Sequence, residues 1–202
     1  MITFGLTGGI ACGKSTVTKV FARNGIPIVD ADVVAREVVA PGTLSIRAIV
    51  ATFGDQMLLS NGTLDRTKLG TLVFQDKQSM FALNIIMGPA IHEESARQLQ
   101  ALHDRGHRIV GYDAALICEM GNADKYRPLI VVYCSRDIQI ERLMKRNSLT
   151  HEQAVARIDA QMPIEQKVQM ANHKINTQGT LEESAAQTER LIEMLKMMEG
   201  AV

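Results

Sequence analysis

The residues with the clearest chemistry lie near the start of the chain, where positions 6–16 read LTGGIACGKST. Gly8, four further residues and then Gly13, Lys14 and Ser15 match the phosphate-binding loop pattern G-x-x-x-x-G-K-[ST]. Glycines let the backbone turn tightly, so successive N–H groups face one concavity that can hold phosphate oxygens. The loop follows a predicted strand and opens a predicted helix, whose N-terminal dipole favours an anion. The sequence therefore predicts a nucleoside triphosphate site.

Each side chain of this loop has an expected role in holding the nucleotide. Lys14 places a compact cation beside the β- and γ-phosphates, and the Ser15 hydroxyl can bind Mg²⁺. The guanine-reading order Asn-Lys-x-Asp does not occur, because the stretch NADK at 122–125 carries those letters in another order. ATP is therefore the expected nucleotide. The predicted ATP-contacting residues of the loop are Gly8, Gly9, Ala11, Cys12, Gly13, Lys14, Ser15 and Thr16.

The loop leaves open where the γ-phosphoryl goes, since water as acceptor gives an ATPase or GTPase and a hydroxyl or phosphate gives a kinase. Asp30 and Asp32, in the stretch IVDAD, end the second predicted strand, at the sheet edge where ligands bind in parallel sheets. Asp32 can orient an acceptor hydroxyl and accept its proton. An aspartate before VVAREVV can equally be a helix N-cap. The residues alone do not decide between these two roles.

Two further groups of charged residues extend the predicted site. Asp113 ends another predicted strand and Glu119 follows it closely, so either carboxylate can hold magnesium through water. For Glu119 the residues alone favour a solvated loop charge. Arg142 and Arg146 lie four residues apart and share a predicted helix face. On a mobile flap they would neutralise charge on the phosphoryl group and exclude water, and the alternative is a pair of exposed helix arginines.

The elements that position these residues alternate between strand and helix. Near-continuous apolar strands separated by helices predict a parallel sheet covered on both faces, a three-layer α/β fold. Between about residues 33 and 105 the sequence instead predicts consecutive helices with a turn at Asn61-Gly62, and this insertion can wall a second substrate pocket. The predicted strands lie in MITFGL, IPIVDAD, RIVGYDAAL, LIVVYCS and HKINT. The main predicted helices are GKSTVTKVFARNG, 136–147, 150–161 and 180–199.

The composition excludes several other classes of protein. Lys plus Arg equals Asp plus Glu at 22 each, so net charge draws the chain neither to nucleic acid nor to anionic lipid. The N-terminus MITFGLTGGI has no basic region or cleavage signal, and no apolar window reaches membrane-spanning length. Cys12, Cys118 and Cys134 form no paired framework or metal-like spacing. We therefore expect a cytoplasmic protein with reduced thiols, and infer no nucleic-acid, membrane or obligate protein partner.

Beyond the loop, the order of motifs along the chain resembles the dephospho-CoA kinase family. The resemblance covers roughly residues 2 to 180 and rests on GLTGGIACGKSTV, IVDADVVAREVVAPGT, DAALICE, IQIERLMKRN and ARIDAQMPIEQK. It implies a P-loop core with a mainly parallel five-stranded sheet, a helical substrate-binding insertion and a helical lid. It also implies the last step of coenzyme A synthesis, in which the γ-phosphoryl of Mg-ATP passes to the ribose 3′-hydroxyl of dephospho-CoA. The implied parts are a core of about 1–32, 106–135 and 172–202, an insertion of about 33–105 and a lid of about 136–171.

Carried onto this chain, the resemblance assigns roles to individual residues. Asp32 matches the proposed base, and Lys14 and Arg142 complete the implied catalytic set. Arg142, Arg146 and Asn176 are implied at ATP, with Asn172 also near the adenine end. The residues implied on the acceptor side are Asp32, Arg36, Pro89, His92, Leu116 and Glu119.

The chain departs from the family's pattern at three places. Ala11-Cys12 stands where Gly-Ser is usual, and the loop accepts either because it needs small side chains there. The family's His-Pro-x-[IV]-Arg segment reads GPAIH at 88–92, which loses both the His and the Arg. Ala115 replaces a proline. The last two changes lie on the acceptor side.

Cys12 carries a separate hypothesis about reactivity. The surrounding amides, the helix N-terminus and Lys14 all favour a thiolate at this position, so alkylation there would block ATP binding. The alternative is a small residue that simply fills the loop.

Two rival functions share the same phosphate loop. The first is another small-molecule or nucleoside-monophosphate kinase, which has the same core and a different acceptor. The second is a regulatory nucleotide-binding module that has lost transfer activity, and the altered segment 88–92 is its support.

Overall fold

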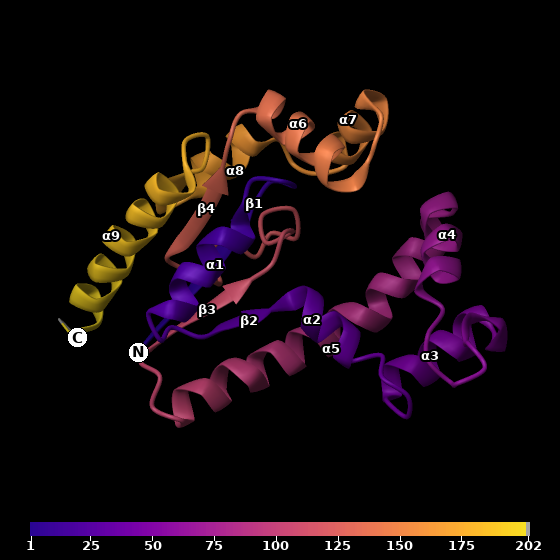
Figure 1. Ribbon diagram of the computed structural model, residues 1–202. Coiled ribbons are helices and arrows are strands. Elements are labelled where there is room, and N and C mark those ends of the chain that lie inside the picture. Colours follow the sequence, from indigo (N-terminus) through magenta and orange to yellow (C-terminus); the bar gives the residue numbers. More distant parts are fainter. Residues whose placement is uncertain (201–202) are drawn as a thin grey trace. The chain divides into compact units, whose positions relative to one another are not determined.

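The computed structural model describes residues 1–200 and divides them into two compact units (Figure 1). The first unit combines residues 1–29 with the chain from residue 99 onward, and it contains the sheet. The second unit is Asp30–Gln98 and is helical. Its boundaries lie close to those of the predicted insertion, 33–105, although the second boundary falls inside a long helix.

The first unit is built on the five-stranded sheet that the sequence predicts. Its strand order is β2-β3-β1-β4-β5, and β1 pairs in parallel with both β3 and β4, as does β4 with β5. The strands are β1 (Ile2–Gly8), β2 (Ile28–Asp30), β3 (Ile109–Asp113), β4 (Leu129–Tyr133) and β5 (His173–Asn176). The prediction of HKINT as the fifth strand is confirmed. Because β1 lies between β3 and β4, the loop that follows β1 starts at the middle of the sheet.

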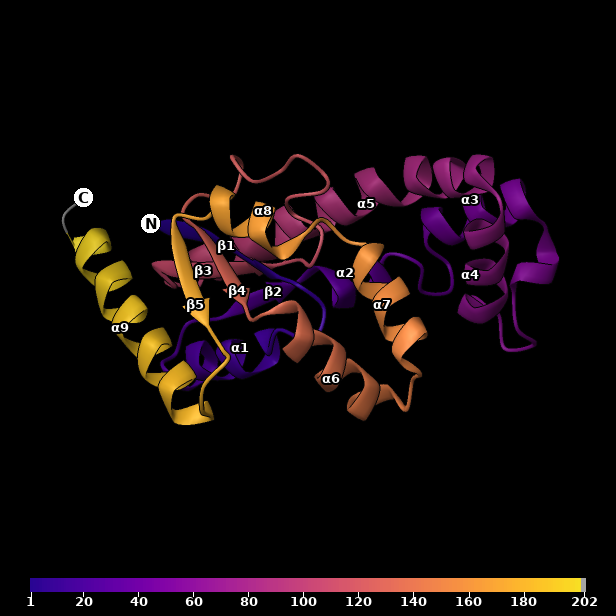
Figure 2. The same cartoon turned by 90° about the horizontal axis from the view of Figure 1, so that it is seen from above.

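Helices cover both faces of this sheet. Helices α1 (Lys14–Arg23) and α9 (Leu181–Gly200) pack together on one face, and α8 (Ile164–Met170) contacts β4 on the other (Figure 2). Every residue of β3 and the first four of β4 are buried, as expected for strands between two helical layers. The rings of Phe4 and Phe21 lie 4.8 Å apart and fix α1 on β1. Helix α1 ends at the predicted Asn24-Gly25, where Gly25 has a φ of 72°.

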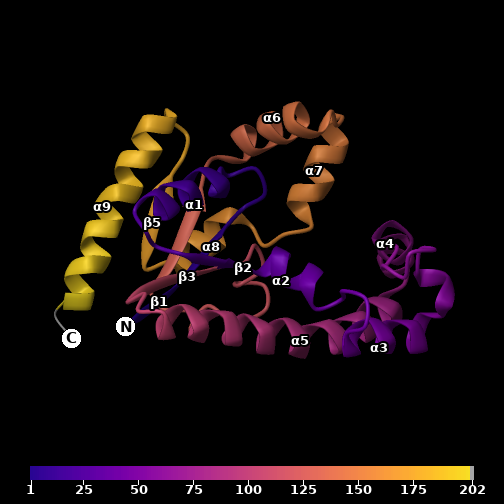
Figure 3. The same cartoon turned by 60° about the horizontal axis from the view of Figure 1, so that its bottom comes forward.

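Two helices that follow β4 form a separate pair (Figure 3). Helix α6 (Arg136–Asn147) ends where predicted, and α7 (His151–Asp159) is two residues shorter than its predicted end at 161. Thr150 starts α7 with a capping box completed by Gln153. The two helices share a small apolar cluster of Leu143, Ala154 and Ile158.

The second unit consists of helices around its own core. They are α2 (Ala31–Glu37), α3 (Leu44–Phe53), the 3₁₀ turn η1 (Asp55–Met57), α4 (Arg66–Gln75) and most of α5 (Lys77–Asp104). The buried core residues are Val39, Ile49, Met57, Leu69 and Val73. The predicted turn at Asn61-Gly62 is confirmed: Gly62 has a φ of 77°, and an isolated bridge joins Leu58 to Leu64 around it. Within residues 1–200, no helix is both long and apolar enough to cross a membrane.

Candidate nucleotide site

The backbone between β1 and α1 has the shape that the loop motif requires. Gly13 is the N-cap of α1 with a φ of 79°, a left-handed conformation that glycine adopts without strain. Gly8 lies so close to β4 that a Cβ there would collide with the Val132 carbonyl. Ala11 has a φ of 61° and is thus a non-glycine residue in the left-handed region. These conformations turn the loop so that its backbone amides can face one concavity, an anion-binding nest, in front of α1.

The Lys14 ammonium forms an ion pair with the Asp113 carboxylate. Parallel pairing brings the two together, because Leu6 of β1 is opposite Asp113 at the end of β3. The Asp113 side chain is 6% exposed and that of Lys14 is 22% exposed. Of the two carboxylates that the sequence left as candidates for the magnesium shell, Asp113 is thus the one beside the loop lysine.

Cys12 does not have the surroundings that its predicted thiolate needs. Its side chain is fully buried, and its Sγ lies 3.6 Å from the Sγ of Cys134 at the end of β4. The hydrogen bond with Cys134 and burial both raise the pKa of the Cys12 thiol. The prediction of a reactive thiolate is therefore wrong, and the alternative of a small residue that fills the loop holds. The sequence could not show that the sulfur points into the core.

A cavity of about 210 Å³ opens beside the start of α1. Arg142 of α6 contributes one wall, and its guanidinium donates hydrogen bonds to the Thr177 carbonyl at 2.6 Å and to Thr177 Oγ1 at 3.3 Å. Thr177 Oγ1 donates in turn to the Cys12 carbonyl at 2.8 Å. The lining residues are Gly13, Thr16, Arg142, Thr177, Gly179, Leu181 and Ser184. Sequence reasoning missed Thr177 and Gly179, although their position directly after the fifth strand was a usable signal.

The other three residues predicted near ATP, Arg146, Asn176 and Asn172, are not among those that line this cavity. Arg146 is exposed, and its Nε donates to Asn147. Asn176 ends β5, and its side-chain oxygen accepts a hydrogen bond from the Gln178 amide. Asn172 Oδ1 accepts from the Leu129 amide at 2.8 Å, so this side chain holds the starts of β4 and β5 together.

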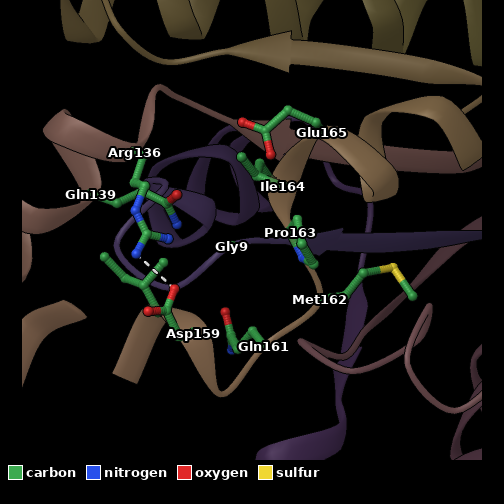
Figure 4. Close-up of a pocket in the computed structure, with 10 residues that line it drawn as sticks. Gly9, Arg136, Gln139, Asp159, Gln161, Met162, Pro163, Ile164 and Glu165 are labelled. Atoms are coloured by element: carbon green, nitrogen blue, oxygen red, sulfur yellow. Dashed lines mark ion pairs between the residues drawn. The ribbon is translucent and has the colours of Figure 1, made fainter. Parts of the chain in front are cut away.

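Residues of α6 and of the segment after α7 also contact the phosphate loop, and Figure 4 shows Gln139, Gln161 and Gly9 around the cavity that they line. The Ile10 carbonyl accepts a hydrogen bond from Gln139 Nε2, and the Ile10 amide donates to Gln161 Oε1, both at 2.8 Å. These two glutamines and Gly9 line a second cavity of about 140 Å³. Arg136 and Asp159 close its rim with an ion pair of 2.6 Å. Helix α6 and the segment after α7 thus hold the same loop residue from two sides.

The Glu119 carboxylate is held by protein groups rather than by solvent alone. Its Oε1 pairs with Lys167 Nζ at 2.7 Å and accepts the Met162 amide at 3.0 Å. The Lys167 side chain is completely buried. The interpretation of Glu119 as a solvated loop charge, which the residues alone favour, is therefore wrong. Leu116, in the same segment, is 44% exposed.

The acceptor-side residues of the helical unit have one informative feature. Asp30 is the N-cap of α2, because its carboxylate accepts the amides of Asp32 and Val33 at 2.8 and 3.4 Å. Asp32 lies in the first turn and is exposed, so the capping alternative for Asp32 is wrong. Arg36 lies one turn further along α2 and is exposed as well.

Pro89 and His92 lie on the exposed surface of α5, which continues through the proline. The helical unit has its own cavity of about 620 Å³, lined by parts of α2, α3 and α5. None of the predicted acceptor residues is among those that line it.

The side chains of the loop region that could bind Mg²⁺ are few, and all bind through oxygen. Among residues 1–200, no group of three or more His, Cys, Asp and Glu side chains could hold a metal ion by itself. Mg²⁺ in nucleotide sites usually keeps several waters and takes only one or two protein oxygens besides the phosphates. The exposed Ser15 and the Asp113 carboxylate beside Lys14 fit that pattern.

These features define the class of P-loop nucleotide-binding proteins: the sheet is parallel, a glycine-rich loop joins β1 to α1, and a lysine is held at the mouth of that loop. The family model for dephospho-CoA kinase matches residues 2–183, and this chain belongs to that family. The dephospho-CoA kinase of Geobacillus kaustophilus is 43% identical over 199 residues, or 98% of each chain. That of Bacillus cereus is 42% identical over 191 residues, 95% of this chain and 96% of the relative. The solved structure of the Campylobacter jejuni dephospho-CoA kinase covers 96% of both chains with a TM-score of 0.74 and 27% identity.

Proposed function

We propose that this protein transfers the γ-phosphoryl of Mg-ATP to the ribose 3′-hydroxyl of dephospho-CoA, giving CoA and ADP. The observation that carries the proposal is the Lys14–Asp113 pair at the mouth of the phosphate loop, in a chain matched almost end to end by that family. The pair keeps an ammonium at the place where β- and γ-phosphates arrive. It also keeps a carboxylate within reach of the metal that accompanies them.

The residues divide the work of transfer between them. The loop amides from Ala11 to Thr16 hold the phosphates, and Lys14, placed by Asp113, neutralises charge on the transferring group. Arg142 borders the cavity where the base of ATP binds, and Arg146 extends the positive charge of α6 when the lid closes. Closure excludes water, which would otherwise compete as the acceptor.

The acceptor hydroxyl is oriented by Asp32. Its carboxylate is not used as the cap of α2, since Asp30 has that role, so Asp32 is free to accept the proton that the 3′-hydroxyl loses. Arg36, one turn away on the same helix, assists on the acceptor side. Pro89, His92, Leu116 and Glu119 are further residues that the family pattern assigns to the acceptor side.

Magnesium is the expected cofactor, and Ser15 and Asp113 are the residues that would hold it beside the phosphates. When bound, it offsets charge on the phosphate oxygens and aligns them for in-line transfer. Three buried, unpaired cysteines suit a reducing compartment, and we place the reaction in the cytoplasm. The expected partners are ATP and dephospho-CoA, with no nucleic acid, because positive and negative side chains balance.

The experiment that tests this function is ADP release from Mg-ATP with dephospho-CoA, adenosine, AMP or no acceptor in parallel. Release that depends on dephospho-CoA supports the proposal and shows that GPAIH at 88–92 is compatible with acceptor binding. Release with AMP instead would make the chain a nucleoside-monophosphate kinase. Bound ATP without release in any sample would indicate a regulatory module.

A further inference from the structure

Lys167 is a buried cation to which the reaction gives no role. It lies on α8 with its side chain 0% exposed, and its ammonium has two partners. One is Glu119 Oε1 at 2.7 Å and the other is the Ala115 carbonyl at 2.8 Å. Removing a lysine from water is costly, and a buried ion pair replaced by apolar residues is often no less stable. Stability alone therefore does not explain why a lysine occupies this place.

The Ala115 carbonyl connects this lysine to the phosphate site. The same carbonyl accepts a second hydrogen bond from Thr7 Oγ1 at 3.1 Å, and Thr7 directly precedes Gly8 at the start of the loop. Two residues before Ala115 is Asp113, which holds Lys14. The turn after β3 thus has its carbonyl fixed by the ammonium on one side and by the end of β1 on the other.

Glu119 anchors the ammonium rather than the turn itself. Its Oε1 accepts both Lys167 Nζ and the Met162 amide, so it joins the segment after β3 to the one that leads into α8. Its second oxygen, Oε2, is buried with no hydrogen-bond partner among the described atoms. The Glu119 carboxylate balances the charge of Lys167, while the hydrogen bond from Lys167 to the Ala115 carbonyl fixes the position of the turn after β3.

We propose that Lys167 is a positioning residue of the phosphate site. By holding the Ala115 carbonyl it sets the turn after β3, and through Asp113 it sets where the Lys14 ammonium lies. This inference rests on the proposed function only in that the loop binds ATP. It predicts that loss of Lys167 weakens ATP binding even where the folded state is as stable as before.

Three variants separate position from charge balance. Lys167→Met alone leaves the partly buried Glu119 carboxylate without its cation, so we expect a loss of melting temperature. Lys167→Met with Glu119→Gln replaces the pair by uncharged side chains of similar size, so we expect the melting temperature to return close to that of the wild type. Glu119→Gln alone keeps the bond between Lys167 and Ala115 but leaves the buried ammonium without its counter-charge, so its melting temperature should fall as well. A surface control is Lys196→Met, which breaks an exposed pair with Glu193.

The readout is the Kd for Mg-ATP by calorimetry without acceptor, beside the melting temperature of each variant. Wild type is measured first, since failure to bind ATP there would refute the nucleotide site itself as well as this inference. We expect the double variant to bind ATP about 10-fold more weakly, because a turn that has lost one buried hydrogen bond must be ordered again when ATP binds. Lys196→Met should stay within about 2-fold. An unchanged Kd in the double variant would overturn the inference, and so would its failure to fold, because Lys167 would then serve the fold alone.

Discussion

The left-handed backbone of Ala11 in the phosphate loop leads to a quantitative prediction about stability. Ala11 has a φ of 61°, where an L-residue with a Cβ is strained by about 1–2 kcal/mol and glycine is not. Ala11→Gly removes this strain, but it also stabilises the unfolded ensemble by roughly 0.5–1 kcal/mol and removes a partly buried methyl group. We therefore expect a variant whose free energy of unfolding is equal to the wild type or slightly above it.

A matched control isolates the effect of φ. Ala96 is exposed in the interior of α5, and Ala96→Gly there should cost about 1 kcal/mol. Because both changes alter the unfolded chain in the same way, the difference between them reports the strain at residue 11. We expect Ala11→Gly to be more stable than Ala96→Gly by about 1–2 kcal/mol, or roughly 2–8 °C in melting temperature. The measurement is thermal unfolding followed by circular dichroism. If Ala11→Gly loses as much stability as Ala96→Gly, the loop does not hold residue 11 in the left-handed region.

Three further predictions concern the site. Asp32→Asn should lower kcat at least roughly 100-fold and leave the melting temperature nearly unchanged. Asp30→Ala should lower the free energy of unfolding by about 1 kcal/mol, because it removes the N-cap of α2. A larger loss of stability in Asp32→Asn than in Asp30→Ala would contradict the assignment of Asp32 as the base and Asp30 as the cap. Cys12 should resist iodoacetamide at pH 7.5 with or without Mg-ATP, because its thiol is buried and the pKa of that thiol is raised. Fast labelling of Cys12 that Mg-ATP prevents would instead support the thiolate hypothesis. Arg142→Met should weaken ATP binding roughly 10-fold by calorimetry, since it removes a wall of the cavity and two hydrogen bonds to Thr177. Unaltered affinity would mean that the adenine base of ATP binds outside this cavity.

The features that the sequence predicted well depend on neighbours in the chain. The strand, loop and helix around Lys14 follow from an apolar run, glycine spacing and a helical pattern within 25 residues, and the structure has them as predicted. The same holds for α6, which both begins and ends where its pattern does. The order of strands alternating with helices was enough to predict a parallel sheet.

The features that the sequence could not supply depend on distant partners. Glu119 looks like a loop charge until Lys167, 48 residues later, is placed beside it by α8. Cys12 looks reactive until Cys134 and burial are included. Asp30 and Asp32 both suit a cap, and only the hydrogen bonds of the helix N-terminus decide between them. Pattern fixes local structure, whereas burial and long-range pairing decide the chemistry of individual side chains.

The measurement that tests the central claim most directly is the fate of the γ-phosphoryl group. Mg-ATP is incubated with dephospho-CoA and, separately, with an analogue that lacks the ribose 3′-hydroxyl, and the products are identified by mass spectrometry. The account predicts stoichiometric CoA and ADP with dephospho-CoA and no phosphorylated product with the 3′-deoxy analogue. Phosphorylation of the analogue, or ADP accompanied by inorganic phosphate and no CoA, would contradict it.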